Sequence, residues 1–364
     1  MSDKSKIEWT DATWNPVRGC EKVSPGCRGC YAIRTALRFS GPGQPYEGLV
    51  TSDPPNWSGV VRFVPEKLAE PYEWRRPRLI FVNSMSDLFH GAVTREQIAA
   101  VFGVMALCGH HTFQVLTKRI ERAAALLPRL SLDECLDAVA ASGAPFRSAK
   151  ASRAVAEEMR KLGRDPSAEE WPLPNVFVGP SIENQETADE RMPHACRIAQ
   201  AGWRVMVSAE PMLGPIDLRL SSGGVPLNSF GVPVGPCGYY CDERVGHVDH
   251  QSQRISWLIV GGESGDDARP LHPQWARSLR DQCAAAGVPF LFKQWGEWAP
   301  ALDHDVGAAR EVRFMSQDGS YVPHASGLGK PSVAFVARVG KAKAGRLLDG
   351  REHNEFPSVG AVTA

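Results

Sequence analysis

The chain has 364 residues with 41 basic and 41 acidic side chains, so its formal net charge is zero at neutral pH. A balanced charge excludes a protein that coats nucleic acid through its overall field, and any contact with a polyanion has to be local. With 43% hydrophobic residues, the chain can bury one large core or two. No apolar run is long enough to cross a bilayer, and no apolar signal segment follows the first residues. We therefore expect a cytoplasmic protein with no membrane partner.

The first predicted element is a short strand at Thr13–Val17, which leads into a loop with three cysteines, Cys20, Cys27 and Cys30. Three thiols this close together predict a metal site, and no fourth Cys or His follows within the next 50 residues. A [4Fe-4S] cluster held by three protein sulfurs leaves one iron open to a small molecule, which favours a reactive centre. Structural zinc usually takes four ligands, and an odd count of nine cysteines argues against disulfides. Zinc and unreactive thiols stay open as alternatives.

Six further strands are predicted where short runs of β-branched and aromatic residues end in polar residues. They are Leu79–Asn83, Phe113–Thr117, Asn175–Gly179, Arg204–Ser208, Trp257–Gly261 and Pro289–Lys293. Helical patterns lie between several of them. A capping box at Thr94 opens one helix, Glu186–Ala201 forms a second, and Pro273–Ala286 forms a third that ends at Gly287. Strands that alternate with helices predict right-handed βαβ units, and hence an α/β fold of the partial or full (β/α) TIM-barrel type.

Two longer spacings between strands indicate insertions, at about 123–174 with further helical patterns and at about 218–254, which is rich in glycine and proline. We expect the barrel to span residues 1–300 and a basic C-terminal extension, 301–364, to pack on it. The second insertion contains the ingredients of a zinc knuckle, Cys237, Cys241, His247 and His250. The spacing between its second Cys and first His is short for a known finger, so a loop without metal is the alternative.

Polar side chains follow almost every predicted strand, and a barrel collects such side chains at one opening. Those expected there are Asn83, Ser84, Ser86, Asp87, Lys118, Arg119, Ser181, Glu183, Asn184, Ser208, Glu210, Gly261, Gly262, Glu263 and Lys293. Loops after strands are commonly polar, so only the repetition of these sets predicts an active site. The cations suit a phosphate or carboxylate, which makes a nucleotide or nucleic-acid substrate a hypothesis. Trp295 and Trp298 would stack a base in that case, and the alternative is that they are core residues.

A three-cysteine loop on a predicted βα barrel resembles the radical S-adenosylmethionine enzymes. Longer strings are similar to one uncharacterised phage and bacterial family of that type. They are Trp14–Pro16, Ser24–Ala32, Val82–Phe89, Leu116–Arg119, Ser208–Pro211, Gly261–Gly265, Lys293–Gly296 and Val339–Gly350. The spacing departs from the commonest pattern of these enzymes, because six residues separate Cys20 from Cys27. Gly29 also stands where an aromatic residue usually precedes the third cysteine.

The resemblance implies that Cys20, Cys27 and Cys30 hold a [4Fe-4S] cluster whose open iron binds S-adenosylmethionine. Reductive cleavage would release a 5′-deoxyadenosyl radical that takes a hydrogen from the substrate, with the electron supplied by a flavodoxin- or ferredoxin-type protein. The alternative is a non-catalytic iron–sulfur or zinc protein that binds nucleic acid.

The resemblance also suggests roles for the polar sets at the strand ends. The methionyl amine is expected near Asn83, Ser84, Ser86 and Asp87. The ribose is expected near Ser181, Glu183 and Asn184, and the adenine near the backbone of Gly261 and Gly262. The candidates for catalysis are Lys118, Glu210, Glu263 and Lys293.

Overall fold

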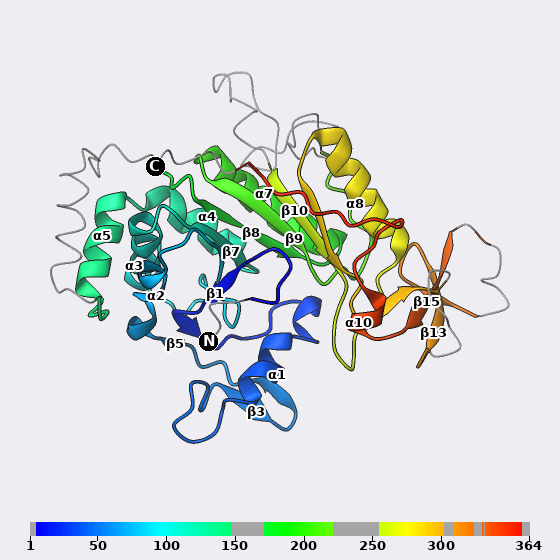
Figure 1. Ribbon diagram of the computed structural model, residues 1–364, viewed down its shortest axis with the longest axis horizontal. Coiled ribbons are helices and arrows are strands. Elements are labelled where there is room, and N and C mark those ends of the chain that lie inside the picture. Colours follow the sequence, from blue (N-terminus) through cyan, green and yellow to red (C-terminus); the bar gives the residue numbers. More distant parts are fainter. Residues whose placement is uncertain are drawn as a thin grey trace.

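A parallel sheet of seven strands forms the centre of the computed structural model, which describes residues 5–146, 171–220, 255–301, 309–323, 330 and 332–358 (Figure 1). The strands are β1 (Ala12–Trp14), β6 (Leu79–Val82), β7 (Thr112–Thr117), β8 (Val176–Ile182), β9 (Arg204–Ala209), β10 (Ile255–Gly261) and β11 (Phe290–Gln294). They are neighbours in this order, and each neighbouring pair is parallel. Within the described ranges β1 and β11 do not pair, so the barrel is open. The predicted α/β fold, a partial barrel, is confirmed.

The strands are buried on both faces, which explains why their sequences read as continuous apolar runs. In β10, Leu258 and Val260 belong to the large core between sheet and helices, whereas Trp257 and Ile259 belong to a separate cluster inside the barrel. Trp9, which precedes β1, joins this inner cluster together with residues from the N-terminal halves of several strands. The interior of the barrel near the N-terminal ends of the strands is therefore filled by apolar side chains. The polar side chains lie at the C-terminal ends.

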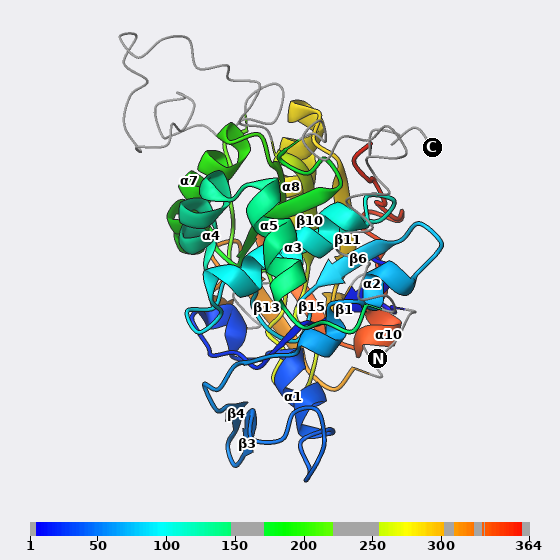
Figure 2. The ribbon, with the colours of Figure 1, turned by 90° about the vertical axis from the view of Figure 1, so that its left-hand side faces the viewer.

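Helices cover the outer face of the sheet (Figures 1 and 2). The longer ones are α3 (Arg95–Leu107), α4 (Ile120–Leu126), α5 (Leu132–Ala141), α7 (Gln185–Gln200) and α8 (Pro273–Ala286). The predicted capping box of α3 is confirmed, because Thr94 Oγ1 accepts from the Gln97 amide at 3.3 Å and Gln97 Oε1 accepts from the Thr94 amide at 3.0 Å. Gly287, at φ +67°, ends α8 as predicted.

Three short elements that follow the cysteines, α1 (Tyr31–Leu37), β3 (Val50–Ser52) and β4 (Pro55–Trp57), extend beyond one end of the sheet (Figure 2). The remaining short elements are β2 (Val17–Arg18), η1 (Pro25–Cys27), β5 (Arg62–Phe63), η2 (Pro65–Lys67), α2 (Glu70–Glu73) and η3 (Leu127–Arg129). The predicted strand Thr13–Val17 is in fact two strands, since β1 ends at Trp14 and β2 pairs with β5. Pro16 lies between them, and its missing N–H cannot continue the ladder of β1.

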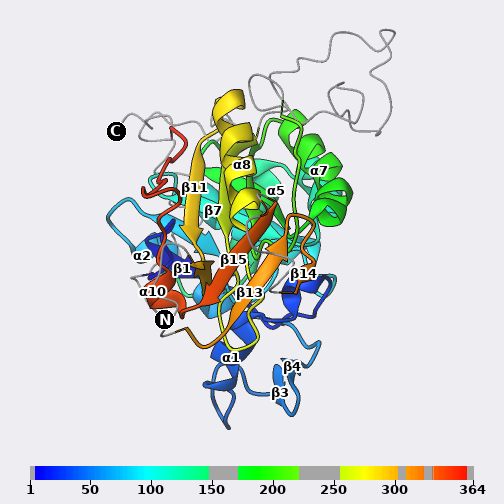
Figure 3. The same cartoon turned by 90° about the vertical axis from the view of Figure 1, so that its right-hand side faces the viewer.

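After β11 the chain forms an antiparallel sheet in the order β12-β15-β13-β14 (Figure 3). Its strands are β12 (Trp298–Pro300), β13 (Val312–Ser316), β14 (Tyr321–Val322) and β15 (Val333–Arg338), and α10 (Lys341–Ala344) follows. The segment after α10 then runs along β11, where the Phe292 amide donates to His353 O at 3.0 Å and the Glu355 amide to Phe290 O at 3.2 Å. It thus covers an edge of the sheet that would otherwise expose unpaired backbone groups.

The four residues of the predicted zinc knuckle lie outside the described residues, as do nearly all of the second insertion and part of the first. Among the helices that the structure describes, none is both long enough and apolar enough to cross a membrane.

Candidate functional site

A cavity of about 420 Å³ opens at the C-terminal ends of the parallel strands, where catalytic residues of βα barrels are found. Its walls include Asn83 after β6, Lys118 after β7, Ser181 at the end of β8, Glu210 after β9 and Glu263 after β10. The volume lies in the range of small-molecule sites. Of the polar residues predicted at the opening, all but Glu183, Asn184 and Gly261 line this cavity.

Cys20, Cys27 and Cys30 line the same cavity as free thiols. No histidine and no further cysteine is among the described residues of its walls. Across the described part of the chain, no group of three or more His, Cys, Asp and Glu side chains is gathered so that it could hold a metal ion. The three thiols therefore line one cavity. Gly19 precedes the first of them at φ +88°, against the carbonyl of Val60, where a side chain has no room.

The three thiols differ in acidity because their electrostatic surroundings differ. Burial raises the pKa of Cys20 to about 12, the charge of Asp87 adds to this effect, and the guanidinium of Arg119 opposes it. Burial also raises the pKa of Cys30. At Cys27 burial acts in the same direction, but the ammonium of Lys118 and hydrogen bonds outweigh it, so that the pKa is lowered. Cys27 is therefore the most easily deprotonated of the three, and the thiolate is the form that binds metals.

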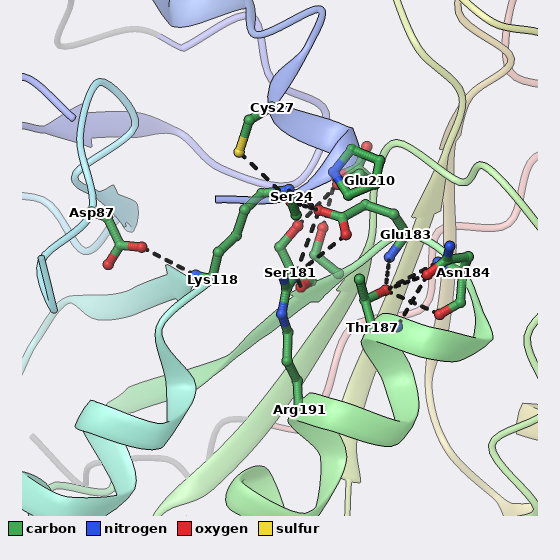
Figure 4. Close-up of polar contacts among 12 residues, drawn as sticks. Ser24, Cys27, Asp87, Lys118, Ser181, Glu183, Asn184, Thr187, Arg191 and Glu210 are labelled. Carbon is green, nitrogen blue, oxygen red and sulfur yellow. Dashed lines mark hydrogen bonds and ion pairs between the residues drawn. The ribbon is translucent and has the colours of Figure 1, made fainter. Parts of the chain in front are cut away.

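Glu183 follows β8 and is fully buried below the cysteine loop, outside the cavity walls (Figure 4). Its Oε1 accepts from Ser24 Oγ at 2.7 Å and from Lys118 Nζ, and its Oε2 lies 3.3 Å from Arg191 Nη1 of α7. The next residue, Asn184, caps α7, since its Oδ1 accepts from the Thr187 amide at 3.0 Å. Of the predicted ribose set, the structure therefore brings Ser181 to the cavity and uses the other two side chains elsewhere.

Two further carboxylates at the cavity are paired with cations. Glu263 accepts two hydrogen bonds from the Arg269 guanidinium, both at 2.7 Å. Glu210 lies 3.0 Å from Lys293 Nζ, and Ser208 Oγ donates to it at 3.2 Å. The four candidates for catalysis thus take part in three ion pairs, one of which joins Glu210 to Lys293. Gly261, predicted near the adenine, does not line the cavity; a Cβ at this position would overlap the Glu210 carboxylate, so glycine makes room for that side chain.

The loop after β6 contains one unsatisfied side chain. Asn83 is 2% exposed, has φ +58°, and neither polar atom of its amide has a hydrogen-bond partner. Asp87, by contrast, accepts from Thr117 Oγ1 at 2.7 Å and from backbone amides, so its carboxylate is occupied. Ser84 and Ser86 donate within the same region, to Asn15 Oδ1 and the Val17 carbonyl. In this loop the free hydrogen-bonding capacity at the cavity therefore belongs to the Asn83 amide.

The two tryptophans considered as stacking partners are core residues. Trp295 is 3% and Trp298 1% exposed, and their indole N–H groups donate to Leu347 O at 2.8 Å and Ala268 O at 2.7 Å. The alternative that they are core residues is correct, and neither ring is open to a base.

Comparisons with known proteins connect this site to a family. The profile of a family described as "Protein of unknown function (DUF5131)" matches residues 4–357. The chain belongs to this family. The predicted membership of an uncharacterised family is thus confirmed, while the description assigns no activity. Among curated proteins, none matches the chain significantly.

Solved structures of spore photoproduct lyase are similar to this family member at a low level. One mutant has 13% sequence identity and a TM-score of 0.35, and the match covers 90% of this chain and 72% of that chain. Another, with bound AdoMet and dinucleoside spore photoproduct, has the same values. A third, with dinucleoside spore photoproduct, has 11% identity and a TM-score of 0.32, over 88% of this chain and 66% of that one. Likeness at this level says nothing of what the present chain binds or does.

Several residues that build the site in this DUF5131 protein were not predicted from its sequence. Arg191 and Arg269 lie in stretches that read as ordinary helix and loop, and only the folded chain brings them to Glu183 and Glu263. Ser24 had a local signal, because a serine before Pro-Gly often begins a turn. Its hydrogen bond to Glu183, 159 positions away in sequence, had none.

Proposed function

We propose that the chain is a radical S-adenosylmethionine enzyme in which Cys20, Cys27 and Cys30 hold a [4Fe-4S] cluster. The observation that carries the proposal is the position of these three thiols around one cavity at the C-terminal ends of a parallel open barrel. Neither a histidine nor a fourth cysteine is among the described residues of that cavity, which leaves one iron of such a cluster without a thiolate or imidazole ligand. When bound, the cluster would supply the electron that cleaves S-adenosylmethionine and starts radical chemistry on a substrate.

The donor set fits a cluster better than a single zinc ion. A structural zinc ion usually takes four Cys or His ligands, whereas the described walls of this cavity supply three cysteines and no histidine. The thiol of Cys27 has a lowered pKa, and Lys118 and Arg119 lie next to Cys27 and Cys20. Cations in these positions favour the thiolate form and so assist metal loading.

The cavity offers distinct groups for the remaining ligands. The Asn83 amide would bind the polar end of S-adenosylmethionine, because its donor and acceptor are buried without a partner. Ser181 and the backbone of Gly262 line the same cavity and would meet the ribose and the adenine. Glu210 and Lys293, 3.0 Å apart, would serve proton transfer or substrate binding.

The proposal includes two partners. A flavodoxin- or ferredoxin-type protein would deliver the electron directly to the cluster. The chain would then need no second redox centre. A nucleotide or nucleic-acid substrate is supported by the cations that line the cavity, Lys118, Arg119 and Lys293, since such groups suit phosphate.

The test is anaerobic reconstitution of the full chain with iron and sulfide, followed by dithionite and S-adenosylmethionine, with 5′-deoxyadenosine measured by mass spectrometry. Wild type is expected to form the product, and Cys27→Ala to form none. Cys196→Ala, which removes a buried thiol of α7, is the matched control and is expected to retain the activity. An iron-loaded wild type that forms no 5′-deoxyadenosine would refute the enzyme and favour a non-catalytic iron–sulfur protein.

A further inference from the structure

The cysteine loop rests on a buried carboxylate on one side. Glu183 is 0% exposed and receives the Ser24 hydroxyl at 2.7 Å (Figure 4). Gly26 packs directly on the same side chain, because a Cβ at this glycine would lie 2.6 Å from Glu183 Oε1. Lys118, just after β7, and Arg191 of α7 balance the charge of the carboxylate. The loop and Glu183 therefore fit each other without space for a ligand between them at Gly26.

A second buried carboxylate supports the other side of the loop. Glu263 is 5% exposed, and a Cβ at Gly29 would lie 2.5 Å from its Oε1. Arg269 pairs with Glu263 and also donates from Nη2 to the carbonyl of Pro25 at 3.0 Å. One guanidinium thus links the carboxylate to the backbone of the loop.

The two supports come from different strands. Glu183 follows β8 and Glu263 follows β10, and β9 lies between these strands in the sheet. Their contacts lie on Ser24–Gly26, just before Cys27, and on Gly29, just before Cys30. The positions of both cysteines are consequently set by rigid strand ends and not by the loop alone.

We propose that Glu183 and Glu263 are positioning residues that fix the thiols of Cys27 and Cys30 through the loop and bind neither substrate nor cofactor. The inference rests on the proposed function, because it assigns to these thiols a geometry that a cluster requires. It also explains why residues 26 and 29 are glycines whose φ angles are ordinary: a methyl group at either position displaces a carboxylate that is already fully paired. Such a carboxylate cannot move without leaving a buried cation unpaired, which is strongly unfavourable.

The first test measures hydrogen–deuterium exchange of the metal-free full chain in peptides that cover residues 18–33. Glu263→Gln keeps the shape of the side chain but removes its charge, and Gly29→Ala keeps every charge but removes the fit. Both are expected to speed exchange in this loop at least fivefold and to leave the peptides of β7 and β9 unchanged. Gly91→Ala is the matched control, because nothing lies within 4 Å of a Cβ there, and wild-type exchange is expected. Wild-type exchange of the loop in Gly29→Ala and Glu263→Gln would overturn the proposal.

The second test measures iron content and the midpoint potential of the reconstituted protein. If Glu263 acts through the loop, Glu263→Gln is expected to reduce iron per chain at least twofold and to shift the potential of the residual cluster, because the thiol of Cys30 is no longer held in place. A lower iron content with a wild-type potential would mean a purely structural role and overturn the assignment. Should Glu263→Gln lose its thermal unfolding transition, Gly29→Ala decides, because it keeps every charged side chain and changes only the fit of the loop on Glu263.

The experiments distinguish a failure of the proposed function from a failure of the positioning role. A wild type that takes up no iron refutes the proposed function, while the exchange experiment still decides whether the glutamates hold the loop. A wild type that loads iron beside variants with unchanged exchange and unchanged potential refutes the positioning role and leaves the enzyme proposal intact.

Discussion

Asn83 provides a direct test of the binding site, because its buried amide has no partner within the protein and a ligand in the cavity would pair it. The amide is 2% exposed with neither polar atom paired, and its backbone has φ +58°. An unpaired buried polar group costs about 1–3 kcal/mol. A left-handed conformation costs most residues with a Cβ roughly 1–2 kcal/mol, and Asn less than most. Asn83→Gly removes both costs, and it adds about 0.5–1 kcal/mol of backbone entropy on folding.

We therefore expect Asn83→Gly to raise the free energy of unfolding of the metal-free chain by about 1 kcal/mol. The lost side chain opens into the cavity and not into a closed void, so no cavity penalty of the usual kind applies. The assay is urea unfolding of metal-free wild type and Asn83→Gly, followed by circular dichroism. Asn83→Ala keeps the unfavourable φ for a residue with a Cβ, so it should be less stable than Asn83→Gly.

The same variant should bind S-adenosylmethionine at least tenfold more weakly once the cluster is reconstituted, which corresponds to about 1.4 kcal/mol. Isothermal titration of both proteins measures this. If Asn83→Gly is less stable than wild type by more than 1 kcal/mol in the metal-free state, the amide is satisfied within the protein and the reasoning is wrong. If it is more stable yet binds as wild type does, Asn83 is strained for a purpose other than this ligand.

Three further predictions concern the fold and the ion pair between Glu210 and Lys293. His272 is buried with a pKa lowered to about 4 by burial, so the unfolded chain binds its proton first, and stability contributed by the neutral ring is lost as pH falls from 6.5 toward 4. Between pH 7 and 5, the free energy of unfolding in urea should fall by roughly 2 kcal/mol more for wild type than for His272→Asn, a variant that keeps an N-cap acceptor. An equal fall in both proteins would contradict this prediction. Gly103→Ala should lower the free energy of unfolding by about 2 kcal/mol, although alanine has the better helix propensity, because its Cβ would overlap the Cys135 carbonyl where α3 meets α5. A more stable variant in urea unfolding would show that the two helices can separate freely. Lys293→Met should destabilise the chain by about 2 kcal/mol, because it leaves Glu210 unpaired. Adding Glu210→Gln should restore most of the lost stability. If the effects of the two substitutions are instead additive in this double-mutant cycle, the pair is not coupled.

Much of the fold was accessible from the sequence because its signals are local. Strands buried on both faces read as short apolar runs, and helix caps such as Thr94 and Gly287 act within four residues of the helix end. The strand Thr13–Val17 was wrong in extent for an equally local reason, the missing N–H of Pro16. Its antiparallel partner β5 is too short and irregular to be recognised from sequence.

The candidate site was predictable in its location but not in its pairing. The rule that strand ends meet at one opening correctly places twelve of the predicted polar positions and the three cysteines at one cavity. It treats every acidic residue after a strand alike, however. Glu183 and Glu210 both follow strands, yet one is buried under the loop and the other faces the cavity. The difference depends on packing against Gly26 and on Arg191, contacts between residues far apart in sequence that no periodicity encodes.

This pairing narrows the search for the residue that acts on a ligand. Of the four acidic residues predicted at the opening, Asp87 is occupied by Thr117 and backbone amides, and Glu183 and Glu263 are held against the cysteine loop. Asp87 and Glu263 also line the cavity, but Glu210 differs because its ion pair is with a lysine of the same wall. A lysine ammonium is a flexible point charge that can exchange a carboxylate for a ligand, whereas a two-point guanidinium contact is harder to replace. The chemistry of substrate recognition should therefore be sought at Glu210 and its lysine, and not at the more deeply buried carboxylates.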